Sequence, residues 1–167
     1  MDLVRLRIPY EFVCERTRPS WRDIRFGLLN ELLDPKAPVA LAIEQVGEVE
    51  VPAAALVELA GAGENEPTSE QVRRLADSEP LCSEGGVRAK WLYLVLAWVY
   101  EHRSEYSDPL KYVEEVYGDF GYPEQIESFV RNMPMVGPDL GSRDANERRL
   151  FERWKQYLDK MATIYSG

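Results

Sequence analysis

Residues 91–100 have the sequence Trp91-Leu92-Tyr93-Leu94-Val95-Leu96-Ala97-Trp98-Val99-Tyr100, an uninterrupted run of apolar and aromatic side chains. A helix with this sequence has no polar face, so it must be buried on every side. A strand of a parallel sheet shows the same kind of run. The segment from Arg88 to Tyr106, however, contains no Gly or Pro and is long enough for about five helical turns. We therefore predict a central helix over residues 87–106, with the other elements packed around it.

Apolar residues also recur at helical spacing on the N-terminal side of this segment. Ser20 is a typical helix N-cap. The apolar residues that follow it form one stripe, which ends at Asp34-Pro35: Ile24, Leu28, Leu29, Leu32 and Leu33. Further helices are predicted over residues 38–46 and 53–60. Another begins at Thr68, where Gln71 has the spacing of a capping box.

The C-terminal side is helical as well. Asp108-Pro109 combines an N-cap with a proline at the first position of a helix that is predicted to end at Gly118. A further helix follows Tyr122-Pro123 and ends at Met133-Pro134, and the last helix follows Ser142. No stretch alternates polar and apolar residues for long enough to form a sheet, and no internal repeat is visible. We therefore predict an all-α fold: one globular domain over residues 1–167, with about seven to nine helices around the helix at residues 87–106.

The charge of the chain is concentrated in its middle. The 167 residues carry 20 Lys and Arg and 29 Asp and Glu, a formal net charge of −9. Residues 38–85 contain only two basic residues and ten acidic ones, whereas residues 1–37 and 136–167 are nearly neutral. This balance disfavours broad contact with nucleic-acid phosphates or anionic lipid. The acidic middle is either a solvated face or a docking surface for a basic partner.

The two cysteines and the N-terminus bear on the compartment. Residues 1–7 lack the apolar core of a signal peptide, so a cytoplasmic location is expected. Cys14 and Cys82 are far apart and form no Cys-x-x-Cys motif. In that compartment they are expected to be two buried thiols, although a disulfide between them is an alternative.

Most signatures of catalysis are missing from the sequence. His102 is the only histidine, which excludes an HExxH motif and a site with two histidine ligands. Neither a phosphate-binding Gly-Lys-Ser/Thr motif nor a Gly-x-Ser-x-Gly elbow is present. We therefore predict no catalytic residue, no cofactor and no bound metal ion. Two enzymatic alternatives stay open: acid/base chemistry by carboxylates such as Glu115 and Asp119, or a cysteine nucleophile with a nearby base.

Residues 106–122 contain five aromatic side chains around the turn Gly118-Asp119-Phe120-Gly121-Tyr122. Two interpretations are open. The aromatic residues either anchor two short helices to the core or form an acidic, aromatic recognition surface, since tyrosine contributes large and rigid contact area at protein interfaces. On the second interpretation, the predicted contact residues are Glu115, Asp119, Phe120, Tyr122 and Glu124.

Several short motifs together resemble a bacterial family of about this length that is classed as a domain of unknown function. Its most specific piece is the Tyr-x-Asp-Phe-x-Tyr-Pro string at residues 117–123. Gly118 and Gly121 depart from the family pattern, in which Ala and Asp are usual. The other matching residues are Ser20-Trp21-Arg22-Asp23-Ile24, Gly27, Lys90-Trp91-Leu92-Tyr93, Asp108-Pro109-Leu110, Phe129-Val130-Arg131 and Met133-Pro134.

The resemblance implies a binding role, because members of the family resemble candidate immunity proteins of bacterial polymorphic-toxin systems. The leading hypothesis is therefore a non-enzymatic module that binds and neutralises a cognate toxin. Many such toxins are basic nucleases, and an acidic inhibitor would associate faster with a basic toxin domain. An adaptor or self-associating scaffold is the alternative, and an enzyme with a carboxylate site is the third hypothesis.

Overall fold

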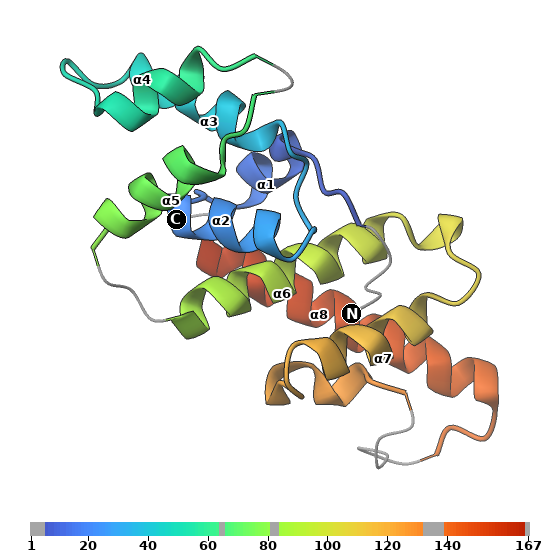
Figure 1. Cartoon of the computed structure of the whole chain (residues 1–167). Coiled ribbons are helices and arrows are strands. Elements are labelled where there is room, and N and C mark those ends of the chain that lie inside the picture. The colour runs from blue at the N-terminus through green and yellow to red at the C-terminus, as the bar shows by residue number, and fades with distance from the viewer. Residues whose placement is uncertain (1–5, 64–65, 81–83, 132–138, 166–167) are drawn as a thin grey trace. The chain divides into compact units, whose positions relative to one another are not determined.

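The computed structural model describes residues 6–63, 66–80, 84–131 and 139–165, and helices dominate them (Figure 1). Within these residues the only β-type pairing is an isolated bridge between Ile8 and Leu33. The predicted all-α fold is therefore confirmed. The helices are α1 Tyr10–Arg16, α2 Trp21–Leu29, α3 Ala37–Val46, α4 Ala54–Ala60, α5 Ser69–Ser78, α6 Glu84–Glu101, the 3-10 helix η1 Arg103–Glu105, α7 Pro109–Asp119, the 3-10 helix η2 Glu124–Phe129 and α8 Arg143–Tyr165.

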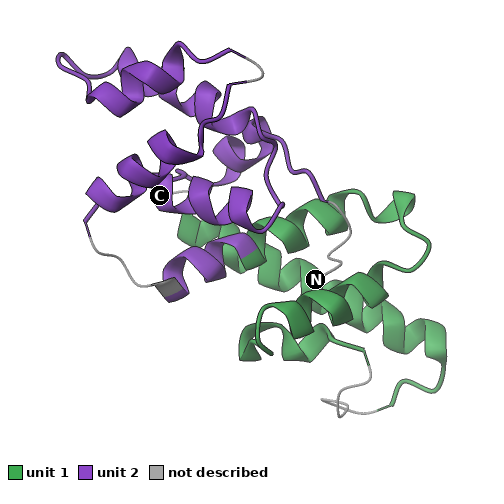
Figure 2. Cartoon of the chain, in the orientation of Figure 1, with its two compact units in different colours: residues 1–4, 92–167 green, residues 5–91 purple. Residues whose placement is uncertain are grey.

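The chain divides into two compact units at a point inside α6 (Figure 2). Residues 5–91 form the first, here called the N-terminal unit, and the described residues from Leu92 onward belong to the second, the C-terminal unit. The arrangement as one domain over residues 1–167 stays a prediction.

Helix α6 contains the apolar run that predicts the fold. Its residues 91–97 and Val99 are all buried, as a helix without a polar face requires. The helix begins at Glu84, three residues before the predicted start at residue 87. It ends at Glu101, five residues before the predicted end at residue 106. At its C-terminal end, the Trp98 carbonyl oxygen contacts both the backbone N–H and the side-chain Nδ1 of His102, at 3.1 and 2.8 Å. A carbonyl oxygen only accepts, so Nδ1 is the donor in this contact.

The start of α2 organises the N-terminal unit. The predicted cap at Ser20 is present and forms a capping box with Asp23, which is only 2% exposed. The Asp23 carboxylate also pairs with Lys90 at 2.5 Å, and its backbone oxygen accepts a hydrogen bond from the Trp91 indole at 2.8 Å. A Cβ at Gly27 would overlap the Trp91 ring, so this position requires glycine.

Helix α2 is shorter than the apolar stripe predicts. It ends at Leu29, because Glu31 adopts a left-handed backbone conformation with φ of 56°. Leu32 and Leu33 therefore lie in the loop after α2, and their side chains are buried in the core. Leu33 also forms the isolated bridge with Ile8. Leu29 is 71% exposed and not on a buried stripe, so that part of the prediction is wrong.

One further helix was missed, and one predicted side-chain cap is absent. Helix α1 was not expected; it buries Tyr10, Phe12 and Val13 within a single short segment. Thr68 precedes α5 but its side chain caps nothing, since the backbone there is already helical, with φ of −114° and ψ of −6°.

The C-terminal unit is built from α7, η2 and α8. Helix α8 begins as predicted at Ser142, whose hydroxyl accepts a hydrogen bond from the Ala145 N–H at 3.1 Å. Trp154 and Phe129 are fully buried and stack with their ring centroids 6.2 Å apart. Helix α8 thus packs on η2, and the predicted end of the η2 segment at Met133-Pro134 lies outside the described residues.

Candidate functional site

The predicted recognition turn follows the C-terminus of α7 and has a defined backbone geometry. The backbone N–H of Tyr122 donates to the backbone carbonyl oxygen of Tyr117 at 2.8 Å, and that of Gly121 donates to the carbonyl oxygen of Gly118 at 3.2 Å. With Gly121 at φ of 77°, these two bonds form a Schellman motif. Helix α7 ends one residue after Gly118, the residue that the sequence pattern suggested as its end.

Tyr117 anchors this turn from inside. Its ring meets the Tyr122 ring edge to face, with centroids 5.3 Å apart, and its hydroxyl donates to Glu127 Oε1 at 3.0 Å. Desolvation and this bond raise the pKa of the Tyr117 hydroxyl. For Tyr117, the interpretation as an anchor of two short helices is therefore the better one.

The five predicted contact residues differ in their exposure. Tyr122 is 67% exposed and adopts φ of 60°, which is unfavourable for a bulky side chain. Glu124 is also exposed, whereas Glu115, Asp119 and Phe120 are half-buried. Tyr122 and Glu124 are thus the members of the set that a partner could reach most fully.

A cluster of ionic contacts lies on the same unit and is centred on Arg131. Its guanidinium bonds both carboxylate oxygens of Asp108, at 2.8 and 3.1 Å, and its Nε bonds Glu114 at 2.9 Å. Glu147 of α8 lies 3.8 Å from the same guanidinium. The hydrogen bonds from Arg131 lower the pKa of Asp108, and they raise the pKa of Arg131 itself. This cluster joins α7, the residues after η2 and α8.

Several residues of the short motifs therefore maintain the fold. Ser20 and Asp23 form the cap of α2, Gly27 makes room for Trp91, and Asp108 pairs with Arg131. These contacts explain the residue types at the motifs without a ligand. A recognition surface must then be sought among exposed residues that the fold does not need.

No catalytic constellation is found in the part of the chain that the structure describes. No group of three or more His, Cys, Asp or Glu side chains could hold a metal ion there. Burial raises the pKa of the Cys14 thiol, so Cys14 lacks the activated thiolate of a catalytic cysteine. Cys82 lies outside the described residues, and with it the predicted relation of the two cysteines.

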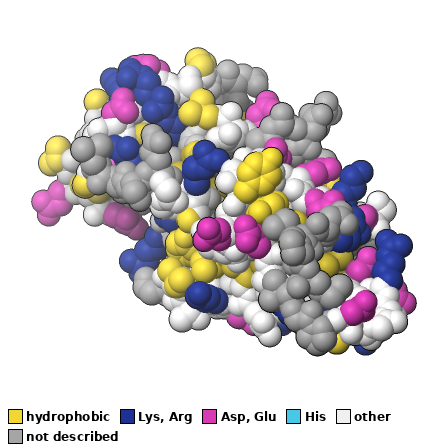
Figure 3. Space-filling view, turned by 90° about the horizontal axis from the view of Figure 1, so that it is seen from below, with side chains coloured by type: hydrophobic (Ala, Val, Ile, Leu, Met, Phe, Trp, Pro, Cys, Tyr) yellow, Lys and Arg dark blue, Asp and Glu magenta, His cyan; other side chains and the backbone are white. Residues whose placement is uncertain are grey.

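A second surface emerges from helices α3 and α4, which lie side by side and are joined by a short connection (Figure 1). We call residues 43–58 the acidic hairpin. Four large apolar side chains project from it, with exposed fractions between 49% and 86%: Ile43, Val49, Val51 and Val57. Groups of hydrophobic side chains bordered by charged ones are also seen on the face shown in Figure 3.

The charges of the acidic hairpin have one sign. Residues 37–72 contain no Lys or Arg, while four glutamates lie on the hairpin itself. The Glu44 carboxylate accepts a hydrogen bond from the Tyr10 hydroxyl at 2.7 Å, and Glu58 forms an ion pair with Arg74 at 2.8 Å. Glu48 and Glu50 are exposed and have no partner among the described residues. The acidic middle segment of the sequence thus includes a surface that is both acidic and apolar.

Charge counting identifies the acidic part of this surface but not its apolar part. Val49 and Val51 alternate with Glu48 and Glu50 ahead of Pro52, and that pattern predicts a short extended piece. The described residues form turns and a bend there, so the valines have no sheet to pack against. Their exposure is visible only in the tertiary structure.

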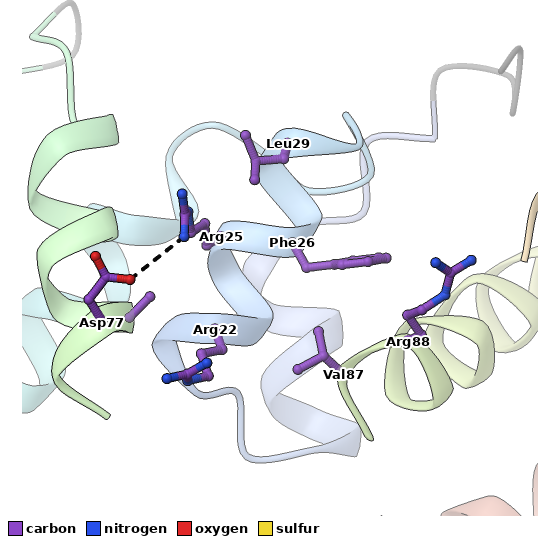
Figure 4. Close-up of a pocket in the computed structure, with 8 residues that line it drawn as sticks. Arg22, Arg25, Phe26, Leu29, Asp77, Val87 and Arg88 are labelled. Carbon is purple, nitrogen blue, oxygen red and sulfur yellow. Dashed lines mark ion pairs between the residues drawn. The ribbon is translucent and has the colours of Figure 1, made fainter. Parts of the chain in front are cut away.

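The N-terminal unit also contains two hollows. One, of about 300 Å³, is lined by residues of α2, α5 and α6 (Figure 4). The other, of about 780 Å³, is lined by apolar residues that include Leu28, Leu33 and Ile43 and by charged residues of both signs. Ile43 belongs to the acidic hairpin as well, so the larger hollow borders that surface.

These features define an all-α protein with exposed acidic and apolar surfaces. No helix in the described residues combines the length and the apolar character that a bilayer span requires. The model of the family described as "uncharacterized protein conserved in bacteria (DUF2247)" matches residues 10–162. The chain therefore belongs to this bacterial family, as the short motifs indicated at the level of a family of unknown function. No curated protein and no solved structure matches the chain.

Proposed function

We propose that this protein is a non-enzymatic binding module, and most concretely an immunity protein that neutralises a basic bacterial toxin domain. The observation that carries the proposal is the acidic hairpin. Its Glu48 and Glu50 carboxylates are exposed beside Val49 and Val51, in a segment without any basic residue. Such a surface complements a partner that presents Lys or Arg around an apolar patch.

Both parts of the surface contribute to binding, in different ways. Burial of exposed apolar area supplies most of the favourable free energy, part of which is offset by the lost freedom of the two partners. The carboxylates add less affinity but speed up the encounter and exclude acidic competitors. Val51, 86% exposed, is the most accessible apolar anchor of the hairpin.

The turn after α7 supplies a second set of contacts in this proposal: Glu115, Asp119, Phe120, Tyr122 and Glu124. Among them Tyr122 combines high exposure with an unfavourable backbone conformation. Strain of this kind is found where a function holds a residue in place. The resemblance to candidate immunity proteins supports the same role.

Co-expression tests the proposal. The full chain is produced together with the C-terminal domain of the candidate toxin from a neighbouring gene, and the survival of the cells is measured. We expect survival with the chain and death without it. Continued killing in the presence of abundant, folded chain would overturn the proposal.

A self-associating scaffold is the second candidate function, favoured by the same exposed valines. Two acidic hairpins would repel each other, so self-association through them should increase with salt concentration. Sedimentation velocity at low and high salt measures this. A monomer at all protein concentrations and in both salts would exclude it.

A further inference from the structure

The hollow between α2, α5 and α6 differs in charge from the rest of the molecule. Three arginines line it, Arg22, Arg25 and Arg88, with Asp77 as its only acidic residue. The whole chain has a net charge of −9. A local excess of positive charge around a hollow in an acidic protein indicates a ligand with negative charge.

The hydrogen bonding of these arginines leaves capacity for a ligand. Arg25 and Asp77 are 3.8 Å apart, at the long end for an ion pair. Arg22 donates from Nη2 to the Glu79 backbone oxygen at 3.3 Å, while its Nε is buried and has no partner. Arg88 is exposed and has no ion-pair partner among the described residues. A buried N–H without an acceptor is unfavourable until water or a ligand satisfies it.

The hollow also has an apolar component, formed by Phe26, Leu29 and Val87. Figure 4 shows the Phe26 ring extending from α2 into the hollow. Val87 and Arg88 of α6 lie on one side of Phe26, and Arg25 and Asp77 lie on the other. Leu29 is 71% exposed at one end of the hollow. A point anion such as phosphate would leave these apolar side chains unused.

We propose that this hollow binds an acidic peptide segment of a partner protein that carries a large apolar side chain. The apolar side chain would lie on Phe26, Leu29 and Val87, since a volume of about 300 Å³ holds one large side chain and its flanking backbone. Carboxylates on either side would bond the guanidinium groups of Arg22, Arg25 and Arg88. The site is separate from the acidic hairpin and has the opposite charge, so it does not depend on the proposed toxin neutralisation.

The test measures binding of one defined peptide to the full chain. The probe is fluorescein-labelled acetyl-Glu-Glu-Leu-Phe-Glu-Glu, followed by fluorescence anisotropy, and amide chemical shifts of the labelled protein locate the site. We expect saturable binding with shifts confined to α2, α5 and the start of α6. A second peptide with Ser-Ser in place of Leu-Phe should bind at least about tenfold more weakly.

Two exposed positions provide variants that do not threaten the fold. Arg88→Glu removes a charge and Leu29→Glu removes an apolar contact, and each should weaken binding at least about fivefold. Arg148→Glu and Ile164→Glu make the same changes at exposed positions of α8. These two variants should bind the peptide within about twofold of the affinity of the natural chain.

Three results would overturn the proposal. The first is the absence of saturable binding at millimolar peptide. The second is equal binding of both peptides, which would indicate a general anion site. The third is an equal loss of peptide affinity in the variants of the hollow and in their α8 controls.

Discussion

The Trp91 ring occupies the space that a side chain at position 27 would need. A Cβ there would also lie 2.9 Å from the Leu33 Cβ, so Gly27→Ala forces a packed region apart. We expect a loss of about 1–3 kcal/mol in the free energy of unfolding, measured by urea denaturation. Gly118→Ala is the matched control, because nothing lies within 4 Å of a Cβ there. Ala should stabilise α7 at that position by about 0.5–1 kcal/mol, and equal losses in both variants would contradict the account.

A substitution at Tyr122 is expected to affect partner binding more than the stability of the fold. Its left-handed backbone conformation costs about 1–2 kcal/mol. Tyr122→Gly removes this strain together with the edge-to-face contact to Tyr117. We expect the free energy of unfolding to change by less than about 1 kcal/mol, while protection against the toxin decreases. A large loss of stability with full protection would show that Tyr122 serves the fold alone.

At the scale of elements, Arg131 links α7 and α8. Arg131→Met removes the guanidinium that Asp108, Glu114 and Glu147 share, so Arg143, 3.3 Å from Glu147, is left as the nearer cation of that cluster. We expect a loss of about 2 kcal/mol at pH 7 by urea denaturation. Arg148→Met, at an exposed position of α8, should stay within about 0.5 kcal/mol of the natural chain.

The same variant has a predictable pH dependence. Because the pKa of Asp108 is lowered in the folded state, the pair stabilises the fold fully above the ordinary aspartate pKa of about 3.9. This stabilisation is lost as the pH falls through the lower, folded-state pKa. The difference between Arg131→Met and the natural chain should therefore shrink below about pH 4. A difference that stays constant from pH 7 to pH 3 would show that packing, and not charge, explains it.

Sequence periodicity predicted those elements whose ends have local causes. Helix α8 begins at the Ser142 cap, and α6 follows from a run with no polar face. Helix α1 was missed because it is only seven residues long and its N-cap, Pro9, has no side-chain hydrogen bond. The early end of α2 depends on one left-handed residue, Glu31, which apolar spacing does not reveal.

The candidate site was predictable to a similar extent. The composition of residues 106–122 predicted the aromatic turn, but not that Tyr117 would anchor it while Tyr122 stays exposed. Charge counting indicated an acidic middle segment. The exposure of Val49 and Val51, however, depends on which elements cover them, and that is a tertiary property.

At the scale of the whole molecule, the net charge of −9 is distributed unevenly, and this matters for association kinetics. If the acidic hairpin guides a basic toxin domain to its site, the association rate constant should fall by about tenfold between low and physiological salt. Stopped-flow fluorescence of the purified pair measures it. The dissociation rate should change much less, because the apolar contacts are not screened. An association rate that does not depend on salt would remove electrostatic guidance from the account.

Protection by charge-reversed variants tests the central claim most directly. Glu48→Lys with Glu50→Lys reverses the two unpaired charges of the acidic hairpin, and Asp144→Lys with Glu152→Lys makes the same change at exposed positions of α8. Survival is measured for cells that express the neighbouring toxin domain with each variant at equal abundance. The account predicts that the hairpin variant fails to protect and that the α8 variant protects like the natural chain. Full protection by the hairpin variant would contradict it.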